Sequence, residues 1–262
     1  MFMDTTMRLK TIAKVILFLS LGLFLVSRLS NGTLSFYIHP RFNPLTAVAA
    51  LTFIFIGLIY AYQHRQIILT GADEHDHDHH GHDHDHGHSH DLSWLALGIL
   101  AIPVLLGAMV QPKPLGAAAL GNREINTGLL ASAPAPSGSQ LAVIPTAGER
   151  NILDWLYLFR ASPDIAAFNG EPVHVIGFVY RDDRFAADEF MVSRFTVSCC
   201  VADAAPIGLI VRWPHAPELA ADQWVEVTGT FLAGAFNGNE MPLLIADEVV
   251  ITDAPAQPYL YQ

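Results

Sequence analysis

Residues 189–202 read EFMVSRFTVSCCVA, and this stretch is the second of five strand-like segments in the C-terminal half of the chain. All five are rich in Val, Ile, Phe and Thr, and Gly, Pro, Asp or Asn separate them. This pattern is typical of short β-strands joined by turns. The segments are EPVHVIGFVYR (171–181), EFMVSRFTVSCCVA (189–202), PIGLIVRWP (206–214), QWVEVTGTFL (223–232) and MPLLIADEVVIT (241–252). The sequence therefore predicts an all-β C-terminal domain.

The order of the segments favours an OB-like five-stranded barrel. HAPELAAD (215–222), between the third and fourth segments, is long enough for one helical turn. Five strands with a short element at that point follow the plan of an OB-type barrel, and a small open β-sandwich is the alternative. Gly177 and Gly229 fall inside strands and are expected to mark bulges or barrel corners. Asn237-Gly238 is a turn signal before the last strand.

A short amphipathic helix and a linker are expected before the barrel. NILDWLYLFRAS (151–162) has a helical period, and Asn151 or Asp154 could cap it. Its apolar face consists of Ile152, Trp155, Leu156 and Phe159. Residues 111–148 are rich in Pro, Ala and Gly and show no sustained period, as a linker does. The barrel domain is therefore placed at residues 149–262.

The first 110 residues are expected to cross a membrane three times. Three apolar runs have the length of a bilayer-spanning helix. The expected helices cover about 12–29, 44–62 and 92–110. Arg28 stands where the cleavage region of a signal peptide would need small residues, so the first run is interpreted as an uncleaved span. The runs carry no carboxylate or histidine that could line an ion pathway, so the chain alone is a poor candidate for a transporter.

The distribution of Lys and Arg determines the orientation of the expected spans in the membrane only weakly. With the N-terminus in the cytoplasm, four Lys or Arg residues flank the spans inside and four outside. The usual dominance of the first helix then favours a cytoplasmic N-terminus. Three spans would put residues 73–91 in the cytoplasm and the C-terminal domain on the extracytoplasmic side of the cell membrane.

Residues 73–91 read DEHDHDHHGHDHDHGHSHD and hold nine histidines and seven carboxylates. Imidazole binds zinc, copper, nickel and cobalt, and carboxylates add oxygen ligands. A segment this polar has no apolar surface to fold around, so it is expected to stay disordered until metal binds. The candidate ligands are His75, His77, His79, His80, His82, His84, His86, His88 and His90. The alternative is a solvated linker between two helices.

Net charge and the absent motifs exclude several functions. The net charge is −11, and residues 92–262 alone contribute −9. An acidic C-terminal half argues against nucleic acid as a partner, because phosphate contacts need clustered Lys and Arg. The sequence has no phosphate-binding loop, no GxSxG, no HExxH and no GxGxxG. The protein is therefore expected not to be an enzyme.

The only two cysteines, Cys199 and Cys200, are adjacent. Consecutive strand residues point to opposite faces, so both thiols can enter one site only where the strand breaks or bulges. In one interpretation the pair binds metal together with Asp203, His174 or His215. In another it forms a labile vicinal disulfide. In a third, one thiol packs in the core and the other lies on the rim.

The apolar spans around a histidine-rich loop, together with GFVYRDD (177–183), the stretch from Arg194 through Gly208 and WVEVTG (224–229), resemble the YcgQ-type family of permease-subunit membrane proteins. The resemblance covers nearly the whole chain, and its most specific part contains the Cys-Cys-x-x-Asp element. It implies a partner, a multi-spanning permease subunit, and a role in the homeostasis of zinc or another cation. It marks Cys199, Cys200 and Asp203 as the residues to test.

Three functions follow from these observations. The first is an accessory membrane subunit of a permease complex. Its histidine-rich loop gathers a divalent transition metal, and its β domain docks on the partner subunit or senses the metal ion. The second is a membrane-tethered OB-type module that binds a protein, peptide or sugar and only buffers metal. The third is a vicinal-thiol redox protein, which the lack of a nearby positive charge or helix N-terminus disfavours.

Overall fold

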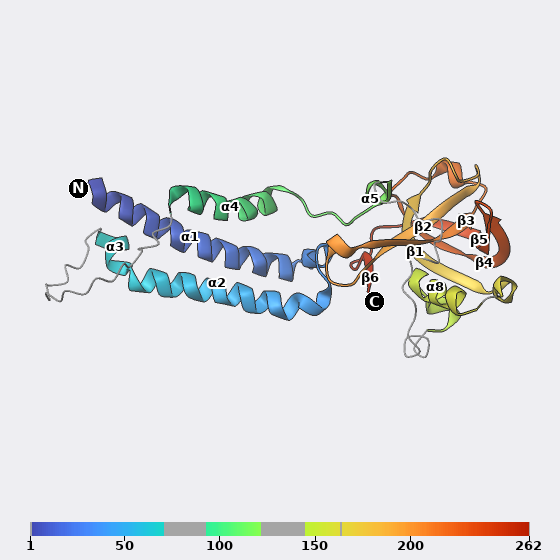
Figure 1. Ribbon diagram of the computed structural model, residues 1–262, viewed down its shortest axis with the longest axis horizontal. Coiled ribbons are helices and arrows are strands. Elements are labelled where there is room, and N and C mark those ends of the chain that lie inside the picture. The colour runs from blue at the N-terminus through green and yellow to red at the C-terminus, as the bar shows by residue number, and fades with distance from the viewer. Residues whose placement is uncertain (1, 71–92, 122–144, 163, 262) are drawn as a thin grey trace. The chain divides into compact units, whose positions relative to one another are not determined.

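The computed structural model describes residues 2–70, 93–121, 145–162 and 164–261. The chain divides into two compact units (Figure 1). One comprises residues 1–34 and 40–112 and is helical, and the other comprises residues 35–39 and 113–262 and contains the barrel. Residues 35–39, which follow the first helix, therefore belong to the barrel unit.

The helical unit contains two helices of membrane-spanning length rather than the three expected. Its helices are α1 (Phe2–Ser30), α2 (Asn43–Gln63), α3 (Arg65–Thr70) and α4 (Trp94–Met109), and the 3-10 turn η2 (Pro40–Phe42) precedes α2. By length and apolar composition, spans at Arg8–Ser30 and Pro40–Gln63 could cross a membrane. The prediction of a third helix of membrane-spanning length at residues 92–110 is wrong, because α4 begins only at its Ser93 cap and ends at Met109, after 16 residues.

Small residues allow the helices to pack closely. A Cβ on Gly22 of α1 would lie 2.5 Å from Ile54 Cγ1 of α2, and one on Gly57 of α2 would lie 3.0 Å from Leu19 Cδ2 of α1. These contacts make α1 and α2 antiparallel. The Arg28 guanidinium, near the end of α1, donates to the carbonyl of Gly107, near the end of α4. Leu17 of α1 and Leu97 of α4, nearer the starts of both helices, line one pocket, so α1 and α4 run in the same direction.

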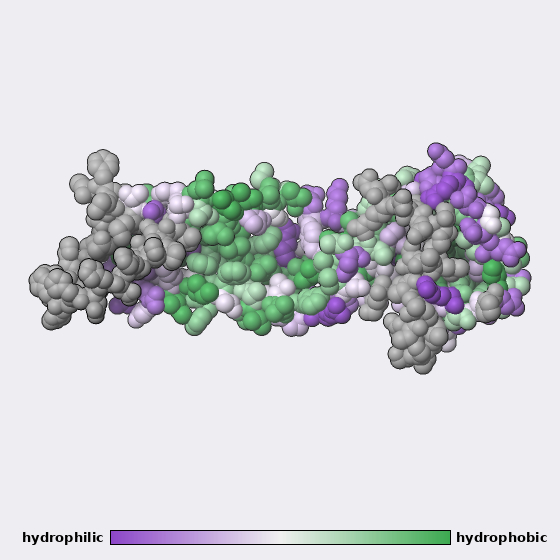
Figure 2. Space-filling view, in the orientation of Figure 1, coloured by the Kyte–Doolittle hydropathy of each residue, from purple (hydrophilic) through white to green (hydrophobic). Residues whose placement is uncertain are grey.

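The outer surface of the helical unit is apolar. Leu45, Leu51 and Phe55 of α2 and Leu95 of α4 are more than half exposed. In the face shown in Figure 2, hydrophobic residues dominate the helices, and hydrophilic residues are frequent on the barrel unit. This distribution is expected of helices solvated by lipid rather than by water.

Five strands of the barrel unit form a closed barrel, as predicted. They are β1 (Pro172–Tyr180), β2 (Glu189–Val197), β3 (Ala205–Arg212), β4 (Trp224–Phe236) and β5 (Asn239–Ile251). Pairing runs β1–β2–β3–β5–β4 and back to β1, and the β3–β5 pair is the parallel one in this ring. The short element expected between the third and fourth strands is the 3-10 turn η6 (Ala216–Glu218).

Helix α8 (Ile152–Ala161) packs its apolar face against the barrel core. Asn151 caps it, accepting from the backbone N–H of Leu153 and Asp154, and the Asp154 carboxylate accepts from the N–H of Asn151. Trp155 is fully buried, and its ring centroid lies 4.8 Å from that of Phe231 on β4. The predicted helix, cap and apolar face are therefore confirmed.

Backbone irregularities fall where glycine permits them. The β4–β5 register shifts between Thr228 and Gly229, so the predicted irregularity at Gly229 is confirmed. Asn237 and Gly238 both have positive φ, as the tight turn between β4 and β5 requires. A sixth strand, β6 (Tyr259–Tyr261), which was not predicted, pairs in parallel with β2.

Candidate functional site: a thiol and carboxylate cluster on the barrel rim

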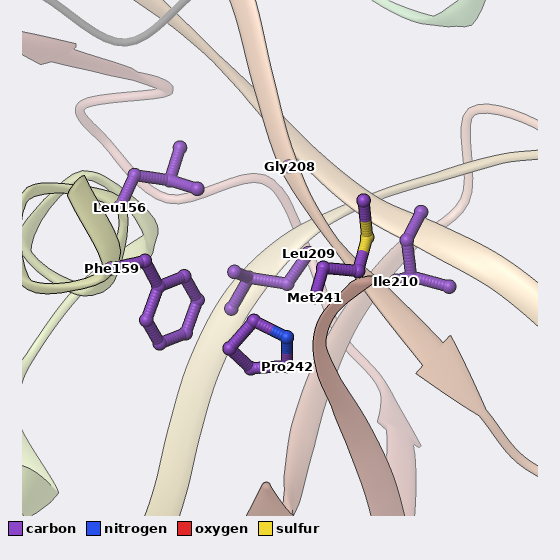
Figure 3. Close-up of a pocket in the computed structure, with 7 residues that line it drawn as sticks. All are labelled: Leu156, Phe159, Gly208, Leu209, Ile210, Met241 and Pro242. Carbon is purple, nitrogen blue, oxygen red and sulfur yellow. The ribbon is translucent and has the colours of Figure 1, made fainter. Parts of the chain in front are cut away.

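Side chains fill the interior of the barrel unit. Between α8, β3 and β5 remains a pocket of about 10 Å³, close to the least that one water needs (Figure 3). Its lining is apolar and consists of Leu156, Phe159, Gly208, Leu209, Ile210, Met241 and Pro242. This pocket is too small for a ligand larger than one water molecule, and the cluster of metal-ligating side chains lies instead on the rim of the barrel.

The two cysteines lie on that rim, just beyond the end of β2. The expectation that β2 continues to residue 202 is wrong: it ends at Val197, and η5 (Val201–Asp203) follows. Because the strand breaks before the pair, strand alternation no longer separates the two thiols, and their sulfurs lie 3.7 Å apart. Cys199 is exposed, Cys200 is partly exposed and both are free thiols. The interpretation in which one thiol packs in the core is therefore wrong.

Asp203 organises the loop that carries the cysteines. One carboxylate oxygen accepts from the N–H of Ser198 at 3.0 Å. The other accepts from the N–H groups of Cys199, at 2.7 Å, and Cys200, at 3.4 Å. A hydrogen bond from the Cys199 side chain is the largest cause that holds the pKa of Asp203 below its ordinary value, and the three backbone hydrogen bonds also stabilise the ionised carboxylate. Asp203 therefore places a negative charge beside both thiols.

That charge controls the chemistry of the thiols. Hydrogen bonding to Asp203, and then to Cys200, raises the pKa of the Cys199 thiol to about 11. A reactive redox cysteine needs a lowered pKa, because the thiolate is the nucleophile. The environment of Cys199 thus opposes the redox function. The same negative charge attracts a metal cation.

The cluster meets the distance requirement of zinc. One ligand atom each from Cys199, Cys200 and Asp203 lies within 4.8 Å of the others. Two thiolates on a tetrahedral zinc, with Zn–S bonds of about 2.3 Å, lie about 3.8 Å apart. The sulfurs of Cys199 and Cys200 are already 3.7 Å apart. The donor set of two thiols and a carboxylate therefore suits zinc or another divalent transition metal.

The two barrel histidines considered as further ligands are engaged elsewhere. His174 on β1 bonds through Nε2 to Glu226 on β4. His215 bonds through Nδ1 to Glu218 at 2.8 Å, and its ring packs against Trp213. Neither belongs to the cluster of metal-ligating groups found among the described residues. The histidines of residues 73–91, His75 through His90, lie outside the described residues.

Sequence reasoning missed one component of the rim, the segment Ser35–His39. The N–H of His39 donates to the carbonyl of Cys199, and the N–H of Val201 donates to the carbonyl of Tyr37, both at 2.9 Å. Ile38 and Cys200 form the antiparallel bridge between these bonds. The only signal in the sequence is a histidine in a connector between two apolar helices, which does not identify a contact 160 residues away.

The chain combines apolar helices with a small β-barrel whose rim carries a Cys-Cys-x-x-Asp element. Comparison with known proteins identifies the family to which it belongs. The chain belongs to the DUF1980 family: residues 13–126 match the DUF1980 N-terminal domain and residues 148–262 match the DUF1980 C-terminal domain. The resemblance to the YcgQ type is thereby confirmed.

A curated relative is the UPF0703 protein YcgQ of Bacillus subtilis (strain 168), which is 24% identical over 97 residues. The match covers 36% of this chain and 34% of that protein, so it spans about a third of the relative's length. No solved structure matches the chain.

Proposed function

We propose that the protein is an accessory membrane subunit that handles a divalent transition metal, zinc foremost, beside a multi-spanning permease. The observation that carries the proposal is the spacing of the Cys199 and Cys200 sulfurs, which is close to that of two thiolates on one zinc, next to the Asp203 carboxylate. Residues 73–91 add a second set of ligands, which would raise the local metal concentration at one membrane face.

The proposed topology adds α4, as a third and shorter crossing, to the two helices of membrane-spanning length. Residues 35–39 pair with the barrel rim, so this connector and the barrel must share one side of the membrane. Because α2 carries the chain back across, the chain must cross once more before Lys113. Helix α4 is apolar and parallel to α1. Its 16 residues span about 24 Å, which local thinning of the bilayer can accommodate.

This topology puts the histidine-rich tract and the rim cluster on opposite sides of the cell membrane, with the tract in the cytoplasm. Single cysteines at Ser89→Cys and Ser137→Cys, in a Cys199→Ser, Cys200→Ser background, test it by labelling intact cells with a membrane-impermeant maleimide. Ser137→Cys is expected to react and Ser89→Cys to react only after lysis. Equal accessibility of the two positions contradicts the topology.

Metal content tests the function itself. Full-length protein in detergent is compared with a variant lacking residues 73–91, each with and without Cys199→Ser and Cys200→Ser, by elemental mass spectrometry. Deletion of the tract is expected to remove most of the bound metal but to leave about one zinc per chain, which the serine changes abolish. A deletion variant that holds no zinc contradicts a rim site. Unchanged metal sensitivity of cells that carry the deletion contradicts a role of the tract.

A further inference from the structure

The segment Ser35–His39 gives the barrel rim a histidine directly opposite Cys199. Ile38 pairs with Cys200 in the antiparallel bridge, so the next residue along, His39, pairs with Cys199. The 2.9 Å bond from the His39 N–H to the Cys199 carbonyl fixes this register. Opposed residues of an antiparallel pair have Cα atoms about 5.5 Å apart, near enough for their side chains to interact.

The His39 ring lies against strand β6, next to the strand from which the Cys-Cys loop emerges. It packs against Tyr261 of β6, with ring centroids 4.3 Å apart, and it is half-buried. Strand β6 in turn pairs with the end of β2, from which the Cys-Cys loop emerges. A zinc-bound imidazole nitrogen lies about 2.0–2.1 Å from the ion, so it must come within about 4 Å of the two sulfurs. The His39 ring is not among the groups whose ligand atoms already lie within 4.8 Å of one another, so ligation requires its side chain to turn from Tyr261 towards the cysteines.

The cluster lacks one ligand for a closed tetrahedral site, since Cys199, Cys200 and Asp203 supply three. We propose that His39 is the fourth ligand, so that metal binding fastens the connector between α1 and α2 to the barrel rim. As the ion binds, each thiol releases its proton to solvent, and the imidazole binds through a neutral nitrogen. This inference rests on the proposed function and completes the ligand set of the same site.

The segment Ser35–His39 already forms hydrogen bonds with the rest of the barrel unit that do not involve the His39 side chain. The Tyr259 hydroxyl donates to the carbonyl of Phe36 at 3.3 Å and accepts from the N–H of Leu115 at 2.8 Å. The backbone bonds of Tyr37 and His39 also persist in any His39 variant except proline. A substitution of the imidazole therefore tests ligation while the connector stays docked.

Cobalt(II) titration of the full-length protein in detergent tests the proposal. Charge-transfer absorption from thiolate to cobalt arises only at the cysteines, so the histidines of residues 73–91 do not contribute to it. The ligand-field bands report whether the ion is tetrahedral. His39→Ala is expected to keep the charge-transfer band, to change the ligand-field bands and to weaken cobalt binding at least ~10-fold, the lower bound for loss of even an outer-shell partner. His215→Ala, a barrel histidine paired with Glu218, is the matched control and should bind as the unmodified protein does.

His39→Cys separates ligation from a merely structural role. A third thiolate at this position is expected to restore tight binding and to raise the charge-transfer intensity by about half, from two thiolates to three. The proposal is overturned if His39→Ala leaves affinity and spectrum unchanged, or if His39→Cys adds no charge-transfer intensity. Absence of the band in the unmodified protein would instead refute the rim metal site, so the two failures are distinguishable.

Discussion

The two units of this protein place their apolar side chains in opposite ways. Every residue of strand β2 in the barrel unit is buried, and the large side chains Phe178, Phe195 and Phe231 are at most 1% exposed. Within helix α2 of the helical unit, only Ala50 and Gly57 are buried, and large apolar residues such as Leu45 and Phe55 face outward. The barrel unit therefore carries its own hydrophobic core, whereas the described helices leave most of their large apolar side chains uncovered, as membrane-spanning helices do.

The first prediction compares a phenylalanine-to-alanine substitution in each unit, and it has the largest expected effect on the free energy of unfolding. Phe231→Ala removes a buried ring that contacts Trp155 and Phe159, with ring centroids 4.8 and 5.0 Å away. It is expected to lower the free energy of unfolding by about 3–5 kcal/mol. Phe55 is 63% exposed, and Phe55→Ala should cost less than about 0.5 kcal/mol.

Denaturant unfolding of the full-length protein in detergent, followed by near-ultraviolet circular dichroism, measures both changes. Equal losses for Phe231→Ala and Phe55→Ala would mean that the α2 surface is buried against something other than lipid or detergent.

The second prediction concerns the barrel rim, whose chemistry is set by charge. With the pKa of Cys199 at about 11, roughly one thiol in a thousand is ionised at pH 8, about a hundredfold fewer than for an ordinary cysteine. Chelator-treated protein should therefore react slowly with iodoacetamide at Cys199. Asp203→Asn removes the first cause of the raised pKa, and alkylation should accelerate at least ~10-fold.

Tandem mass spectrometry resolves alkylation at Cys199 from alkylation at Cys200. Rapid alkylation of Cys199 without a change at Asp203 would restore the redox interpretation of the pair.

Glycine substitutions sharpen the contrast between a closed barrel and a loosely surrounded helix. A Cβ on Gly229 would lie 2.0 Å from the backbone carbonyl oxygen of Ile245, so Gly229→Ala forces β4 and β5 apart and should cost at least about 1–3 kcal/mol. A Cβ on Gly98 of α4 meets nothing within 4 Å. Gly98→Ala should therefore leave stability unchanged or raise it by up to about 1 kcal/mol. Thermal unfolding of the two variants checks both signs, and a destabilised Gly98→Ala would reveal a neighbour for α4.

Local patterns in the sequence predicted most of the barrel, and contacts between distant segments account for what they missed. Alternation and turn residues identified five strands, and the period of 151–162 identified α8 with its Asn151 cap. The end of β2 was misjudged because apolar residues continue through Cys200. The Asp203 carboxylate instead takes the N–H groups of Ser198 and Cys199 out of the ladder.

The sequence predicted only those residues of the candidate site that lie close together in the chain. Cys199, Cys200 and Asp203 lie within five residues of one another, and the structure brings them together as expected. The pairing of His39 with Cys199 and the three-residue strand β6 depend on segments far apart in the chain. No periodicity encodes such contacts, because their energy comes from backbone hydrogen bonds that any sequence can make.

The smallest expected effect is on the polar exterior of the barrel, where the core plays no part. Asp182 accepts from Arg184 Nε at 3.0 Å and from the Tyr180 hydroxyl at 3.0 Å, and hydrogen bonding from Arg184 holds the pKa of Asp182 below its ordinary value. Because the folded-state pKa is the lower one, this contribution to stability is present above the unfolded pKa of about 3.9 and is lost as the pH falls through the folded value. Solvent screening limits it to about 1 kcal/mol or less. Asp182→Asn should thus lower the free energy of unfolding slightly at pH 7 and progressively less towards pH 3. Asp183→Asn removes the same charge one residue away and controls for net charge. If the loss of unfolding free energy in Asp182→Asn does not shrink in acid, Asp182 and Arg184 stabilise the fold through packing rather than through charge.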